Sequence, residues 1–394
     1  MASKRRLTIS LLVLLLLSGC ATASQPAAPG GASPAGKSGG GTYTFGVLIP
    51  LTGAAASIGT VFRNGLDMAV EEINRQGGAA GMTLEANVQD HKASAQGGVA
   101  AMNQLVNIAR VPYVISSFSS PTLAAQPIAE QNKVLLINSG GTDLSLLNKP
   151  YLYNNQVMSP NLVPPLAQFA WDNGHRRAAM LSNNDAYGDG NRKVFREVWQ
   201  RLGGEVVADE VFPIESTDFS AQLTKVKAAN PDFVLITAFG QTHGLVVKQA
   251  RALGLDAQLA GPLATNDLVQ QAGPAAEGFW DNGIAVDPDT TNPGARQFID
   301  SYRQKYGVVP DWSSGTMYES VYLLRDLIEA VVKDGGDPRS GEALLKALQR
   351  QPEFQNFLAA GTVRFGDDQS VIRTLAIRQV VNGQFQPIKF VEVR

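Results

Sequence analysis

The chain has 394 residues, of which 44% are hydrophobic and 17% charged, so it carries enough apolar material for two or three domains. Its formal net charge is -2 and its only basic cluster, Lys4-Arg5-Arg6, lies at the N-terminus, which argues against nucleic acid as a partner. A single cysteine, Cys20, excludes an internal disulfide framework and a zinc site built on cysteine pairs. The three histidines are too scattered to indicate a metal cluster, so we expect no metal and no cofactor.

Residues 1–19 form a predicted signal peptide, because the basic cluster precedes an apolar run, Leu7 to Leu17, that is too short to span a bilayer. The segment Leu17-Ser18-Gly19-Cys20 resembles the lipobox of bacterial lipoproteins. The resemblance implies cleavage before Cys20 and lipidation of this residue. The mature chain would then be anchored in the cell envelope, in the periplasm or on the outer cell surface. An ordinary signal peptide with an incidental cysteine is the alternative.

Residues 21–42 contain only Ala, Gly, Ser, Pro, Thr, Gln and one Lys, a composition that predicts a flexible tether. The phosphate-loop pattern at 31–38 lacks the strand and the helix that such a loop needs, so we interpret it as compositional.

From residue 43 onward the apolar pattern alternates between strands and helices. In the first half we predict strands at 43–50, 82–89, 111–115 and 134–137, and helices around 65–76, at 95–108 and ending near Asn132. In the second half we predict helices at 162–171, 190–202, 219–229 and 244–253, and strands at 178–181, 205–212, 233–236 and 258–262. Two alternating halves imply two α/β domains with a cleft between them, where small-molecule sites are common.

The last third of the chain has a different pattern. Helices dominate for about 65 residues after Ala285 to Asp289, and one of them carries Val321, Leu324, Ile328 and Val331 on a single stripe. From Gly361 onward we predict short strands, with Asn382-Gly383 as a hairpin turn.

Two polar loops follow predicted strands of the first half, at Ser116 to Ser120 and at Asn138 to Thr142. Both offer hydroxyl groups and backbone N–H groups near the start of a helix, which suits an anion such as a carboxylate. The alternative is that these residues are only helix caps and turn formers. Because two such loops lie on neighbouring strands, we favour a binding site.

Four segments of the body resemble motifs of one family. They are FGVLIPLTG at 45–53, GLDMAVEEIN at 65–74, NDAYGDG at 184–190 and QARALGL at 249–255. They resemble the type I periplasmic solute-binding proteins of ABC transporters, in the branched-chain amino acid (Leu/Ile/Val-binding-like) group, in a lipoprotein form. The resemblance implies an α/β fold of two Rossmann-like lobes that are joined by a three-strand hinge and close on the ligand.

On this basis we divide the chain into a signal peptide (1–19), a lipidated cysteine with its tether (20–42), lobe 1 (43–156 plus 288–362) and lobe 2 (157–287 plus 363–394). The crossovers are expected near 154–159, 285–289 and 362–367.

The resemblance also implies ligand contacts. Ser119 and Ser120 match one carboxylate-binding loop, and Gly140, Gly141 and Thr142 match the second. Tyr187 and Phe239 match aromatic positions of lobe 2, and Trp312, Tyr318 and Ile58 are further pocket candidates.

Leu263 departs from the family pattern. In amino-acid-binding members, the turn matched by Gly261-Pro262 is followed by a glutamate that neutralises the ligand ammonium, and a leucine cannot do this. A buried ammonium without a counter-charge would cost several kcal/mol. We therefore expect a ligand that lacks an α-amine. Asp267 is a possible substitute counter-ion, with Thr265 and Asn266 as hydrogen-bonding alternatives, which keeps amino acids open.

We expect a non-enzymatic, monomeric solute-binding protein that delivers a small molecule to an ABC permease and its ATPase subunits. A sensor without transport is an alternative. A hydrolase is disfavoured because the α/β body has no Gly-x-Ser-x-Gly elbow, and a dehydrogenase because no Gly-x-Gly-x-x-Gly follows the first strand. His91 follows a predicted strand on the cleft side, and we expect it to lie in a solvated loop, with a ligand contact as the alternative.

Overall fold

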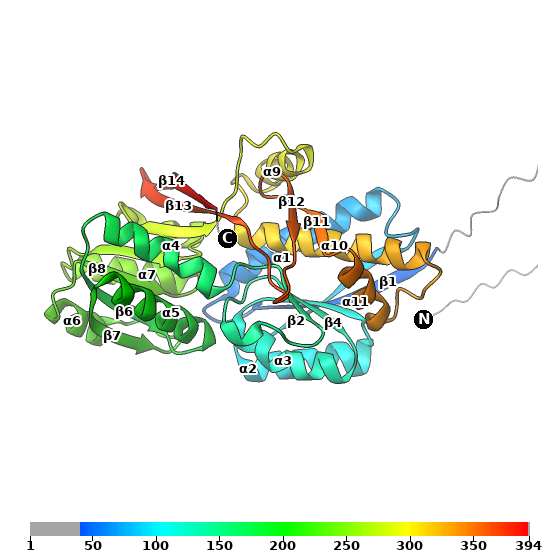
Figure 1. The fold of residues 1–394 in the computed structure, drawn as a ribbon, viewed down its shortest axis with the longest axis horizontal. Coiled ribbons are helices and arrows are strands. Elements are labelled where there is room, and N and C mark those ends of the chain that lie inside the picture. The colour runs from blue at the N-terminus through cyan, green and yellow to red at the C-terminus, as the bar shows by residue number, and fades with distance from the viewer. Residues whose placement is uncertain (1–39, 393–394) are drawn as a thin grey trace, which may run out of the picture. The chain divides into compact units, whose positions relative to one another are not determined.

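The structure is a computed structural model that describes residues 40–392. These residues build two lobes, each centred on a sheet with helices packed against it. Figure 1 shows them side by side, with α4 to α7 of lobe 2 in green at the left and α2, α3 and α10 of lobe 1 at the right. None of the helices in this range combines the length and the hydrophobicity needed to cross a membrane.

Lobe 1 contains a five-stranded parallel sheet with the order β2-β1-β3-β4-β5. Its strands are β1 (Thr42–Ile49), β2 (Thr83–Asp90), β3 (Tyr113–Ser116), β4 (Leu135–Asn138) and β5 (Leu152–Asn154). Its helices include α1 (Ala56–Arg75), α2 (Ala95–Asn103) with the π-helix η1 (Gln104–Ala109), α3 (Ser119–Gln131), α9 (Pro293–Tyr306), α10 (Trp312–Lys333) and α11 (Gly341–Arg350).

The longest helices of lobe 1, α1 and α10, pack directly on each other. A Cβ atom at Gly65 would lie 2.1 Å from the carbonyl oxygen of Ser314, so only glycine allows the two backbones to approach this closely. The predicted stripe of α10, Val321, Leu324, Ile328 and Val331, is buried.

Lobe 2 contains a seven-stranded sheet with the order β14-β13-β10-β9-β8-β6-β7. Its strands are β6 (Arg177–Asn183), β7 (Glu205–Phe212), β8 (Phe233–Thr237), β9 (Gln258–Pro262), β10 (Trp280–Ile284), β13 (Thr374–Val381) and β14 (Gln384–Glu392). Its helices are α4 (Ser159–Asp172), α5 (Ala186–Leu202), α6 (Ser220–Ala228), α7 (Gly240–Ala252) and α8 (Asn266–Ala272). The hairpin predicted at Asn382-Gly383 is confirmed, because both residues have positive φ and join β13 to β14 in antiparallel pairing.

The mixed α/β class with two lobes is as predicted, and the differences are local. Helix α5 begins at Ala186 and not at residue 190, because the Asp185 side chain accepts the Gly188 N–H at 2.9 Å and caps it. Strands β5 and β10 and helix α8 were not anticipated, since each is too short to show a period. The exact lobe boundaries stay predictions.

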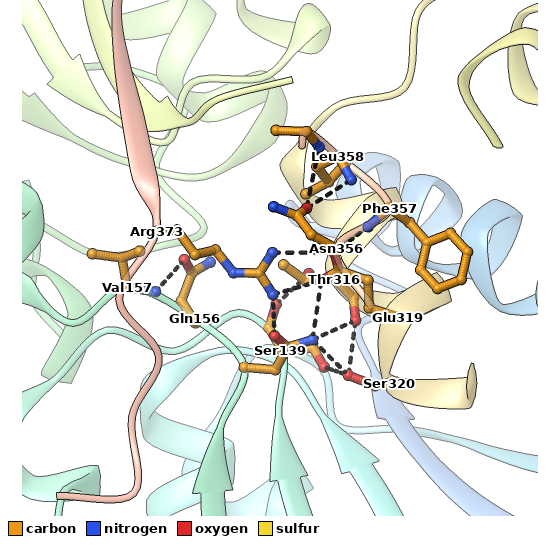
Figure 2. Close-up of polar contacts among 12 residues, drawn as sticks. Ser139, Gln156, Val157, Thr316, Glu319, Ser320, Asn356, Phe357, Leu358 and Arg373 are labelled. Atoms are coloured by element: carbon orange, nitrogen blue, oxygen red, sulfur yellow. Dashed lines mark hydrogen bonds and ion pairs between the residues drawn. The ribbon is translucent and has the colours of Figure 1, made fainter. Parts of the chain in front are cut away.

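The chain passes between the two sheets after β5, after β10 and after the short ribbon of β11 (Glu353–Gln355) and β12 (Thr362–Arg364). Near these passages lies a buried ion pair between Arg373 and Glu319, whose side chains are 2% and 0% exposed. Asn155 accepts from Arg373 and donates to Thr316 O at 3.1 Å, while Phe357 N donates to Glu319 Oε1 at 2.9 Å (Figure 2). We call these residues the hinge cluster.

Breaking the hinge cluster should destabilise the fold. Arg373→Met leaves the Glu319 carboxylate buried without its cation, so the free energy of unfolding should fall by about 3–5 kcal/mol in urea denaturation. Arg63→Met, which removes an exposed pair with Asp67, is the matched control and should cost less than about 1 kcal/mol. Equal small losses in both variants would contradict a structural role for the buried pair.

Candidate functional site

A cavity lies where the carboxyl ends of the strands of both lobes meet. Its lining comes from both lobes and comprises Ile58, Gly140, Tyr187, Ala238, Phe239, Gly240, His243, Leu263, Thr265 and Trp312. The cavity volume is about 10 Å³, which is room for about one water molecule. A larger ligand therefore requires the lobes or their side chains to move.

The first polar loop places its hydroxyl groups behind the cavity. Ser119 Oγ accepts the backbone N–H groups of Thr142 at 3.0 Å and of Asp143 at 3.3 Å. Ser120 Oγ accepts the N–H of Ala186, at the start of α5 in lobe 2, at 3.2 Å. In this conformation the serines hold the second loop and the opposite lobe, and neither lines the cavity.

The second loop reaches the cavity through Gly140. The Asn138 side chain accepts the N–H groups of Gly140 at 3.1 Å and Gly141 at 2.6 Å, so this turn is fixed from within lobe 1. Thr142 is fully buried, and its hydroxyl accepts from Ser159 Oγ at 3.1 Å. Of the predicted carboxylate-loop residues, Gly140 alone is part of the cavity lining.

Lobe 2 contributes an apolar and aromatic wall. Tyr187 donates its hydroxyl to Pro262 O at 3.1 Å, and burial raises its pKa well above the usual range, so it stays a neutral donor. Burial also raises the pKa of Asp185, the cap of α5, to about 6. Phe239 directly precedes α7 and lines the cavity, as does Thr265 before α8.

Leu263 lies in the cavity wall with a positive φ of 56°. Its N–H donates to Asn282 O at 2.8 Å, and its carbonyl accepts from Trp312 Nε1 of lobe 1 at 3.1 Å. The backbone at this position is therefore fixed from two sides, with an apolar side chain on the cavity. Among the described residues, no acidic side chain lines the cavity.

Asn266 and Asp267 lie beside the cavity and not on its wall. Asn266 is exposed, whereas Asp267 is half-buried. The Oδ2 atom of Asp267 is buried and has no hydrogen-bond partner within residues 40–392, and the same is true of Ser57 Oγ. Both atoms flank Gly240, since a Cβ atom there would lie 2.8 Å from Ser57 Oγ and 3.5 Å from Asp267 Oδ2.

The sequence analysis missed Ala238, Gly240 and His243, which line the cavity, and Phe118, which does not line it but contacts Phe239. Phe118, in the middle of the first polar loop, stacks on Phe239 with ring centroids 4.0 Å apart. His243 lies one helical turn after Phe239 and lines the cavity, and its Nε2 has no partner among the described residues. The signal for His243 was its i, i+4 spacing from Phe239 on one helix face. No sequence pattern pointed to Phe118, because the loop around it was identified by its serine hydroxyl groups.

The prediction of a solvated His91 was wrong. His91 follows β2 but is fully buried, because Ser117 Oγ lies 3.0 Å from its Nε2 and the Phe118 ring covers it at 5.5 Å. Burial lowers the pKa of His91 to about 3, and that of His243 to about 3 as well. Both rings are therefore neutral near pH 7.

Within residues 40–392, no group of three or more His, Cys, Asp or Glu side chains is arranged to hold a metal ion. The cavity offers neutral donors, backbone groups and aromatic faces, which suit a small molecule with an apolar body.

Buried neutral His91 should make stability pH-dependent. A histidine in the unfolded chain has a pKa of about 6.5, whereas folded His91 has a pKa of about 3. Between about pH 6.5 and 3 the unfolded chain therefore binds more protons than the folded chain, so the free energy of unfolding falls as the pH falls. The advantage of the wild-type chain over His91→Gln should shrink by up to about 1.4 kcal/mol per pH unit below 6.5. Urea denaturation at pH 7, 6 and 5 measures this, and a constant difference would contradict it.

The chain is similar to characterised proteins over most of its length. The family model for periplasmic binding proteins matches residues 42–384. Over 272 residues the chain is 30% identical to the leucine-, isoleucine-, valine-, threonine- and alanine-binding protein of Pseudomonas aeruginosa. The aligned region covers 67% of this chain and 72% of that protein.

Solved structures have the same fold. A branched-chain amino acid transporter substrate-binding protein of Streptococcus pneumoniae, in complex with isoleucine, matches with a TM-score of 0.80 at 26% identity, over 89% of this chain and 99% of that one. A solute-binding protein of an ABC transporter from Rhodopseudomonas palustris, in complex with benzoate, matches with a TM-score of 0.80 at 19% identity, over 89% and 97%. At 19% identity, the match to the Rhodopseudomonas palustris protein shows a shared fold and nothing more.

Proposed function

The chain belongs to the periplasmic binding protein family, in its branched-chain amino acid-binding group, and from this premise we propose that it is the extracytoplasmic solute-binding lipoprotein of an ABC importer. Its ligand is a small carboxylate without an α-amine, held in the cleft between the lobes. As a monomer, the closed protein delivers this ligand to a membrane permease and its ATPase subunits.

The observation that carries the ligand proposal is the apolar wall at Leu263. An ammonium group in the cavity would meet a leucine side chain there, and the wall supplies no acidic group within the described residues. Desolvating the ammonium without a counter-charge would cost several kcal/mol. The benzoate bound by the Rhodopseudomonas protein is a carboxylate of the amine-free class.

Lobe closure is the proposed binding mechanism. Contacts between the lobes join Ser120 to Ala186, Trp312 to Leu263, and Glu215 Oε2 to the N–H of Ala54 at 3.3 Å. A ligand that touches both lobes would add its own contacts to these and so favour the closed state.

Amino acids are a second candidate, favoured by the buried Asp267 Oδ2, which has no hydrogen-bond partner among residues 40–392. An ammonium group beside Gly240 would find this oxygen and Ser57 Oγ on its two sides. The relatives from Pseudomonas and Streptococcus are amino-acid-binding proteins.

A thermal-shift panel separates the two candidates. After unfolding and refolding to remove bound molecules, the chain is mixed with leucine, 4-methyl-2-oxopentanoate, 4-methylpentanoate and benzoate. A ligand at ~100 times its Kd adds about 2.7 kcal/mol of stability, which is a clear shift. We expect shifts with the amine-free acids only. A shift with leucine that Asp267→Asn abolishes would establish the amino acid candidate.

The proposed lipid anchor on Cys20, which lies outside the described residues, is tested separately. In cells fed a clickable fatty acid, the wild-type chain should be labelled and recovered in the membrane fraction, whereas Cys20→Ser should lose the label. Ser24→Ala is the matched control and should behave as wild type. Undiminished labelling of Cys20→Ser would rule out this anchor.

A further inference from the structure

Two aromatic rings face each other across the cleft from different lobes. Phe118 comes from the start of α3 in lobe 1 and Phe239 from the start of α7 in lobe 2. Their centroids are 4.0 Å apart and their planes are inclined by only 12°. Tyr187 also stacks on Phe239, at 4.6 Å. All three side chains are buried.

We propose that the Phe118–Phe239 pair selects a flat, aromatic carboxylate, an inference that rests on the proposed solute-binding function. Because the rings are nearly parallel and belong to different lobes, a small hinge opening separates them into a slot with two π faces. Carbon atoms in contact lie about 3.5–4.0 Å apart, so one inserted planar ring would contact both faces at once. A branched or puckered body is thicker and loses this two-sided contact.

Phe118 is held in place by its own backbone and by its neighbours. Its φ of 67° is an outlier for a bulky residue, the kind of conformation that persists only when the surrounding structure imposes it. The His91 ring packs on it at 5.5 Å. The Phe118 ring therefore presents a fixed face to the cleft.

The same ring lies next to the groups proposed for the carboxylate. Phe118 directly precedes Ser119, and its backbone nitrogen is 3.3 Å from the position that a Cβ atom on Gly140 would take. A carboxylate attached directly to an aromatic ring could thus reach the two loops of lobe 1 while its ring enters the slot. Ile58, Leu263 and Trp312 complete the surroundings with further apolar surface.

Calorimetric titration of the full chain with benzoate and with cyclohexanecarboxylate tests the inference. The two acids share the carboxylate and the number of ring carbons but differ in planarity and π face. We expect benzoate to bind at least about tenfold more tightly, equivalent to about 1.4 kcal/mol. Phe118→Leu and, independently, Phe239→Leu should reduce this ratio to threefold or less.

Phe354→Leu is the matched control, because Phe354 is buried equally well but stacks on Phe365 beside the β11–β12 ribbon. It should leave the ratio unchanged. The inference is overturned if the wild-type ratio is near one, or if neither leucine variant lowers it. Equal binding of both acids defeats this inference alone, whereas binding of leucine and of neither acid defeats it together with the amine-free ligand proposal.

Discussion

The most deeply buried ion pair in the described part of the chain, Arg373 with Glu319, lies near the passages between the two sheets. Arg373 and Glu319 would each be costly to bury alone, and they are tolerated together because each compensates the charge of the other, while Asn155 accepts from Arg373 and the Phe357 N–H donates to Glu319. These residues come from separate parts of the sequence: Asn155 and Arg373 lie on segments that pass between the sheets, whereas Glu319 lies within α10 (Figure 2). Moving Arg373 away would leave the Glu319 carboxylate buried without its cation.

The carboxyl ends of strands from both sheets meet at the cavity. Parallel strands that end at one edge present loops and helix N-termini there, which is where ligands of open α/β sheets bind. In this protein the two lobes satisfy each other's loops, since Ser120 bonds to the start of α5 and Trp312 to the Leu263 carbonyl. The side chains that line the cavity are mainly apolar or aromatic, and none of those described is acidic.

Much of the fold was predictable, and part of the site. The strand and helix pattern of both lobes follows from apolar periodicity, and the family motifs led to Tyr187, Phe239 and Leu263, which line the cavity. Ser119 and Thr142 were identified for their hydroxyl groups, yet these groups bond within the protein. His91 was misjudged, because the groups that bury it come from the segment at Ser117 and Phe118 and not from its own neighbours.

The sequence by itself determined local features: most of the strands and helices, the Asn382-Gly383 hairpin turn, and that a leucine stands at position 263. These follow from interactions between residues a few positions apart. Only the tertiary structure decided which polar groups have hydrogen-bond partners, and that the buried Oδ2 atom of Asp267 has none among the described residues. It also decided that the rings of Phe118 and Phe239 lie face to face. The Phe118–Phe239 contact joins the two lobes, and no local sequence pattern encodes it, because the two residues are far apart in the chain.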